Sequence, residues 1–161
     1  MMMRPATAVV LGLLVLCPVL ANAQPAIIPR MAQAPQDPNR TYEVLRNYLS
    51  DSPRSSFKLV STDPSTRTIV AKRSGIDTQT WNELAYCKVG PEHLLDTLQD
   101  NAVTVTVKVE PSPKRASFIS VSADFEATYA LGSSETTTQC ISNGIVENDL
   151  LKIVGGNSSG T

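Results

Sequence analysis

The chain has 161 residues, of which 42% are hydrophobic and 18% are charged, and its formal net charge is −1. This length suits a single domain that is large enough to bury a core. Lys and Arg do not outnumber Asp and Glu, and there is no basic patch or basic amphipathic helix. We therefore expect binding neither to nucleic acid nor to a membrane surface.

Residues 1–23 have the pattern of a secretory signal peptide. Arg4 supplies a positive charge, residues 8–16 form an apolar run, and residues 21–23 (Ala-Asn-Ala) are small as signal peptidase requires. The sequence predicts cleavage after Ala23 and a periplasmic or secreted protein. The apolar run is shorter than the roughly 20 residues of a membrane-spanning helix. No later segment is a better candidate, so we expect no transmembrane segment.

Cys17 offers an alternative, which is anchoring through a lipid. Bacterial lipoproteins carry a lipidated cysteine after a short motif that begins with Leu, and Cys17 follows Leu14-Val15-Leu16. The motif requires a small residue directly before the cysteine, where this chain has Leu16. We therefore favour cleavage after Ala23.

Residues 24–37 are rich in Pro and Ala. Proline fixes φ and removes an amide donor, so this composition predicts a flexible, extended tether. A single folded domain is expected over residues 38–156, and a disordered tail over 157–161.

The domain is predicted to begin with a helix. Asp37-Pro38 is typical of an N-cap followed by proline at the first helical position. Tyr42, Leu45 and Leu49 then recur at helical spacing and indicate an amphipathic helix. Asp51-Ser52-Pro53 should end it, because the residue before a proline avoids helical geometry.

A β-hairpin is predicted next. Residues 57–61 and 67–72 have strand-like composition, and the turn residues 62–66 between them include Asp63 and Pro64. The following segment, residues 81–89, fits either a helix or a strand, and we favour a short strand that ends near Cys87.

A short helical turn over residues 92–98, opened by Pro91, should precede the strongest strand signals. Residues 102–109 and 118–131 alternate strictly between apolar and polar side chains. Such alternation predicts strands with one buried and one solvated face. A last strand is expected over residues 135–141.

The chain should end in a helix. Ser142-Asn143 resembles an N-cap, and Glu147 falls in the first turn, where a negative charge is favourable. The apolar positions predict a buried stripe of Ile145, Val146, Leu150, Ile153 and Val154. The fold class is therefore α+β, an antiparallel β-sheet with an N-terminal and a C-terminal helix packed on one face.

Cys87 and Cys140 are the two cysteines that remain after the signal peptide is removed. In an oxidising compartment they are expected to form a disulfide. A structural zinc site requires four nitrogen or sulfur ligands, so we expect no metal and no other cofactor.

Three side chains are candidates for catalysis, and none is favoured. His93 is the only histidine and lies in a polar, loop-like stretch, whereas Asp124 and Glu126 lie on the solvated face of a strand. The chain lacks a Gly-x-Ser-x-Gly motif. A hydrolase that uses these residues is therefore the least favoured function, and we expect the protein not to be an enzyme.

Trp81 and Tyr86 are the aromatic residues of one loop-like region. Such residues are frequent in interaction hot spots, so they are candidates for partner binding. Packing in the core near the disulfide is the alternative, and the more common one.

The order of helix, hairpin, further strands and closing helix, together with Cys140-Ile-Ser-Asn-Gly-Ile-Val-Glu147, resembles uncharacterised envelope proteins of Gram-negative bacteria. More distantly it resembles the α+β domains of lipoprotein subunits of the outer-membrane β-barrel assembly machinery. The resemblance covers roughly residues 38–156, and no functional residue is carried over from it. It implies a non-catalytic interaction role with a partner in the envelope.

The predicted function is thus a non-catalytic, envelope-associated interaction module, stabilised by one disulfide. Its contact surface would be the solvated face of the sheet or an unpaired strand edge. The alternative is a carrier of a small apolar ligand held between the sheet and a helix.

Overall fold

The computed structural model describes residues 28–88, 97–113, 116–131 and 133–155. The helices are α1 (Pro38–Ser50), α2 (Ser52–Ser55), α3 (Thr78–Leu84) and α4 (Ile145–Ile153). The strands are β1 (Arg30–Ala34), β2 (Lys58–Asp63), β3 (Thr68–Ser74), β4 (Ala85–Tyr86), β5 (Thr97–Ser112), β6 (Ala116–Leu131) and β7 (Ser134–Ser142).

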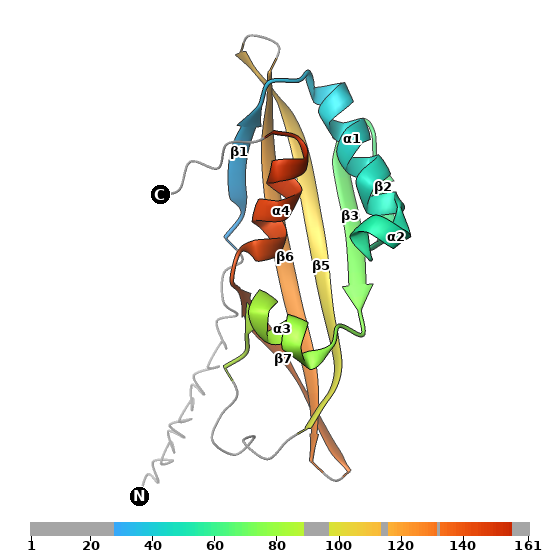
Figure 1. Ribbon diagram of the computed structural model, residues 1–161, viewed down its shortest axis with the longest axis vertical. Helices are drawn as coiled ribbons and strands as arrows, with labels where there is room; N and C mark the ends of the chain where they lie inside the picture. The colour runs from blue at the N-terminus through green and yellow to red at the C-terminus, as the bar shows by residue number, and fades with distance from the viewer. Residues whose placement is uncertain (1–27, 89–96, 114–115, 132, 156–161) are drawn as a thin grey trace, which may run out of the picture.

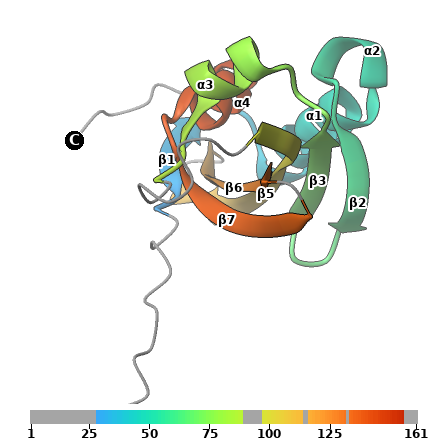
Figure 2. The ribbon, with the colours of Figure 1, turned by 90° about the horizontal axis from the view of Figure 1, so that it is seen from below.

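Within these residues the strands form one seven-stranded antiparallel sheet. Its order is β2-β3-β5-β6-β7-β4, and β1 pairs with β6 in addition. The helices lie along one face of the curved sheet (Figures 1 and 2). The predicted α+β fold class is confirmed. No helix of the described chain is long and apolar enough to cross a membrane.

The two long strands β5 and β6 form the centre of the sheet. Both contribute alternate side chains that are buried beneath the helices: Val103, Val105, Val107, Val109, Ile119, Val121, Ala123, Phe125 and Ala127. This confirms the faces that the alternation predicts. Both strands are longer than predicted, because their backbone pairing continues from Thr97 opposite Ala130 to Ser112 opposite Ala116.

The prediction of a flexible tether over residues 24–37 is wrong for residues 30–34, which form strand β1 of the sheet. Residues 24–27 lie outside the described residues. β1 pairs with residues 117–121 of β6, and its side chains Ala32 and Ala34 are buried in the core. Pro29 and Pro35 lie immediately outside the strand, where the ladder does not require their amides. The folded domain therefore begins at β1 rather than at residue 38.

Helix α1 begins as predicted. The Asp37 carboxylate accepts hydrogen bonds from the amides of Asn39 and Arg40, both at 3.1 Å, and Pro38 opens the helix. Tyr42, Leu45 and Leu49 are buried against the sheet. Buried apolar side chains of this size each contribute roughly 1.5–3 kcal/mol to folding.

The predicted hairpin is confirmed as β2 and β3. The Asp63 carboxylate holds its turn together by accepting hydrogen bonds from the amides and hydroxyls of Ser65 and Thr66. These bonds, led by the Ser65 side chain, lower the pKa of Asp63 to about 2. The turn is therefore held by a charged carboxylate at neutral pH.

The prediction of a strand over residues 81–89 is wrong for residues 81–84, which belong to helix α3, and is confirmed for Ala85 and Tyr86, which form β4. The Asp77 carboxylate caps this helix by accepting from the Thr80 amide at 2.9 Å. Trp81 and Leu84, one helical turn apart, are both buried against the sheet. Residues 92–96 of the predicted helical turn lie outside the described residues, and residues 97 and 98 belong to β5.

Helix α4 begins without the predicted side-chain cap. Its N-cap is Gly144, with φ +81°, where a side chain would collide with the guanidinium of Arg30. Asn143 instead donates through its amide to Leu84 O and through Nδ2 to Glu83 O, each at 2.9 Å. It thus joins the start of α4 to the end of α3.

The buried stripe of α4 is confirmed for four of its five predicted residues, since Val146 and Ile153 pack against the core that contains Leu150 and Val154. Leu150, Leu151 and Val154 are buried, whereas Ile145 is 42% exposed. Glu147 is buried as well, and its Oε2 accepts a hydrogen bond from Ser142 Oγ at 2.9 Å. The predicted stripe therefore fails at Ile145, and Glu147 and Leu151 are buried in addition to it.

Candidate interaction surface

The face of the sheet opposite the helices is left uncovered in the described chain (Figure 2). We call it the open face. Its side chains are the polar members of the alternating strands, mostly half-buried or exposed. They include Thr68, Val70 and Lys72 of β3, Ala102, Thr104, Thr106 and Lys108 of β5, and Ser120, Ser122, Asp124 and Glu126 of β6.

A lane of small side chains on β5 separates charges on its two sides, and Asp100 and Lys108 of the same strand lie beyond its two ends. We call Ala102, Thr104 and Thr106 of β5 the central lane. In the strand register Thr104 stands between Lys72 on β3 and Asp124 on β6, and Lys58 on β2 pairs with Lys72. Glu126 pairs with Ala102 in the next outward-facing row. Two lysines therefore flank one side of the lane, and two carboxylates flank the other.

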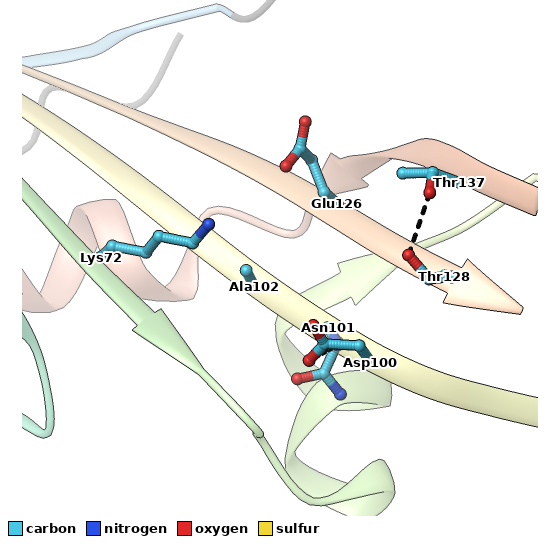
Figure 3. Close-up of a pocket in the computed structure, with 7 residues that line it drawn as sticks. All are labelled: Lys72, Asp100, Asn101, Ala102, Glu126, Thr128 and Thr137. Carbon is cyan, nitrogen blue, oxygen red and sulfur yellow. Dashed lines mark hydrogen bonds between the residues drawn. The ribbon is translucent and has the colours of Figure 1, made fainter.

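A shallow groove of about 80 Å³ follows the lower part of this lane. Lys72, Asp100, Asn101, Ala102, Glu126, Thr128 and Thr137 line it. In Figure 3 Lys72 and Glu126 project from their strands on the two sides of Ala102, and Thr128 bonds Thr137 at 3.0 Å. The groove is well below the roughly 300–1,000 Å³ of small-molecule pockets. It suits side chains of a macromolecular partner better than a cofactor.

Asn101 does not offer a side chain to this groove. Its side chain is buried, and it bonds both the amide and the carbonyl of Ile76, each at 2.7 Å. Asn101 therefore fixes the segment between β3 and α3. The polar groups available on the groove come from the lysine, the carboxylates and the threonines.

On the open face, Asp124 is the carboxylate whose pKa is shifted by its surroundings. Partial burial raises its pKa, and the neighbouring Glu126 charge raises it further. Glu126 is itself exposed and accepts a hydrogen bond from Gln139 Nε2 at 2.9 Å. The charge of Asp124 is therefore already less hydrated than that of a free carboxylate.

We expect Asp124 to titrate above its ordinary value of 3.8 in an NMR pH titration. Because its folded pKa is raised, this group disfavours the fold above that pKa, and the penalty fades as the pH falls towards 3.8. Glu126→Gln should lower the midpoint of Asp124 without restoring 3.8, since burial is the larger cause. A midpoint at or below 3.8 in the unaltered protein would contradict this assignment.

Of the two aromatic candidates for partner binding, Trp81 follows the favoured alternative of packing in the core, whereas Tyr86 does not. Trp81 is 1% exposed and packs edge to face on Phe125, with ring centroids 5.5 Å apart. Tyr86 is 61% exposed on β4. Trp81 thus belongs to the core, since its helix places it against the sheet, and only Tyr86 is accessible to a partner.

The predicted disulfide is present between Cys87 and Cys140. It joins the end of β4 to β7 and closes a loop with a sequence separation of 53. His93 and Cys17 lie outside the described residues. Among the described residues, no group of His, Cys, Asp or Glu side chains could hold a metal ion.

Lys72 is the member of the surface that sequence reasoning missed. Its strand was predicted, but β3 pairs with β5 across the intervening α3 and β4. The alternating pattern predicts on which face of the sheet Lys72 lies, but not which strand pairs with β3. Lys72, Thr104 and Asp124 are aligned in one row only because the tertiary fold pairs β3 with β5 and β5 with β6.

No family model matches the chain, and no curated protein matches it. Among solved structures, it is similar to a DUF4468 family protein from Bacteroides ovatus, with 12% identity and a TM-score of 0.39. The match covers 73% of this chain and 66% of the length of that one. A likeness this distant carries no argument about function.

Proposed function

We propose that this protein is a non-catalytic interaction module of an extracytoplasmic compartment, and that its open face binds a partner. The observation that carries the proposal is the asymmetry of the sheet. One face is fully packed by α1, α3 and α4, whereas the other presents ordered charges and is uncovered in the described chain. The disulfide suits an oxidising compartment, as the predicted signal peptide does.

The open face is favoured over the edge strand β2 as the contact surface. All six residues of β2 are exposed, so its edge is accessible. However, the register of β2 shifts between Leu59 and Ser61, which places a bulge at Val60. Bulges bend an edge and discourage the addition of another strand.

The alternative function, a carrier of an apolar ligand between sheet and helices, finds less support. The space beneath the helices is occupied by side chains that are at most 1% exposed, among them Leu45, Leu49, Trp81 and Leu151. The groove described above lies on the opposite, polar face. An apolar ligand would therefore have to displace packed core side chains.

A photo-crosslinking amino acid at position 108 tests the proposal in cells that produce the protein. Lys108 lies on the open face with its side chain 52% exposed, and Glu43 on α1 is a matched control at 50%. We expect a specific crosslinked species from position 108 and none from position 43. Equal crosslinking from both positions, or none from position 108, would contradict an interaction role for the open face.

A further inference from the structure

We propose that the Cys87–Cys140 disulfide is a redox-sensitive clasp, which a dithiol reductant opens from the edge of the sheet to release β4 while the remaining fold is kept. This inference goes beyond the proposed function, and no step of it requires that the open face binds a partner. It follows from the place of the two cysteines in the sheet and from the contacts that hold the neighbouring elements.

The disulfide joins residues that stand opposite each other on two antiparallel strands. β4 pairs with β7 so that Tyr86 stands opposite Ile141, and the next pair in the same register is Cys87 with Cys140. The Cα atoms of the two cysteines are 4.2 Å apart, which is typical of closely opposed residues on neighbouring strands. The S–S bond therefore runs across the ladder from β7 to β4.

In the described chain, one sulfur of this bond is more open to attack than the other. A thiolate attacks a disulfide along the line of the S–S bond, from the side opposite the sulfur that leaves. β4 is the last strand of the sheet on this side, and Cys87 is partly exposed. Cys140 is only 7% exposed and is paired with Phe125 of β6, which lies on the other side of β7. A reductant therefore reaches Cys87 Sγ.

Reduction proceeds in two exchange steps. A thiolate of the dithiol attacks Cys87 Sγ, the S–S bond breaks, and Cys140 leaves as a thiolate that takes up a proton. The second thiol of the reductant then loses its proton and attacks the reductant's own sulfur in the mixed disulfide, which releases Cys87 as a thiolate that is protonated in turn. Two electrons pass to the cysteines, and the dithiol is oxidised to a disulfide.

Little besides the disulfide holds β4 against β7. The strand has only two residues. Tyr86 is 61% exposed, so its burial contributes little, and the buried Ala85 offers only a methyl group. So short a pairing opens at a low free-energy cost once its cross-link is removed. Reduction should therefore release β4 and uncover the backbone of Ile141 and Ser142, with which it pairs.

The release should stop at the end of α3, because other contacts hold this helix. Trp81 and Leu84 are buried, and Trp81 packs on Phe125. Asn143 donates hydrogen bonds to the carbonyl oxygens of Glu83 and Leu84, each at 2.9 Å. None of these contacts involves a cysteine, so we expect them to persist after reduction.

Glutathione tests the point of attack, because the first product of a monothiol is a mixed disulfide. The oxidised protein is treated with glutathione, acid stops the exchange at early times, and peptide mass mapping locates the adduct. We expect glutathione on Cys87 and not on Cys140 in the folded protein, and on both cysteines in a control unfolded in urea. Equal labelling of the two cysteines without urea, or a reaction that occurs only in urea, overturns the proposal.

NMR of the protein reduced with dithiothreitol tests whether the opening is local, with the oxidised protein as the matched reference. Nuclear Overhauser contacts between Tyr86 and Ile141 should disappear, whereas those between the rings of Trp81 and Phe125 should remain. If the first contacts persist, the ladder holds without the disulfide, and if the second are lost, unfolding spreads beyond β4. Either result overturns the clasp and leaves the crosslinking test of the open face unaffected.

Discussion

Replacement of both Cys87 and Cys140 by serine should lower the free energy of unfolding by about 4 kcal/mol. The disulfide closes a loop with a sequence separation of 53, and removing it returns that loop's conformational freedom to the unfolded chain. The pair also fastens β4, which has only two residues of its own. Domains are stable by only about 5–15 kcal/mol, so this loss is a large part of the total.

Urea denaturation followed by circular dichroism measures this effect. The unaltered protein in reducing buffer is the matched control, and it should lose stability to a similar extent as the double variant. Reductant should not affect the double variant further. If the free energy of unfolding falls by less than about 1 kcal/mol in the double variant or in the reduced protein, the loop contributes little entropy to the unfolded chain.

Phe125→Ala should destabilise the fold by about 3–5 kcal/mol. Phe125 is fully buried on β6 and packs against Trp81 of α3, so its loss leaves a cavity between the sheet and a helix. Trp81 is the only tryptophan, and its fluorescence reports on this position directly. The spectrum of the folded variant should shift because one neighbour of the indole ring is lost.

The adjacent residue provides the control for this substitution. Glu126 faces the open side of the same strand, and Glu126→Ala should change stability by no more than about 0.5 kcal/mol. Similar losses for the two variants would mean that both faces of β6 are packed. A loss confined to Phe125→Ala is the result that a sheet covered on one face requires.

The two faces of the central strands could be predicted from sequence because burial imposes a period of two. The alternation of Val103 to Val109 and of Ile119 to Ala127 is sufficient to identify the inner face. Helix α1 could also be predicted from sequence, since Asp37, Pro38 and the spacing of the apolar residues all indicate the same helix. These features are local, and local chemistry determines them.

Other elements depend on contacts that sequence patterns do not contain. β1 buries only the small side chains of Ala32 and Ala34 and lies between prolines, and it becomes a strand because the long β6 offers it an edge. Asn143 was predicted to cap α4 but bonds the end of α3 instead, because the disulfide and β4 bring α3 beside it. The rows of the open face likewise follow from a pairing of β3 with β5 that skips two elements.

Paramagnetic relaxation by a soluble gadolinium chelate, measured by NMR along β5, tests most directly whether the sheet has one packed and one available face. At low protein concentration, the side chains of Thr104 and Thr106 should relax strongly, and those of Val103 and Val105 weakly. Glu43 on α1, whose side chain is 50% exposed, should relax strongly as well and serves as the exposed reference. Equal enhancement along both faces of β5 would contradict this account.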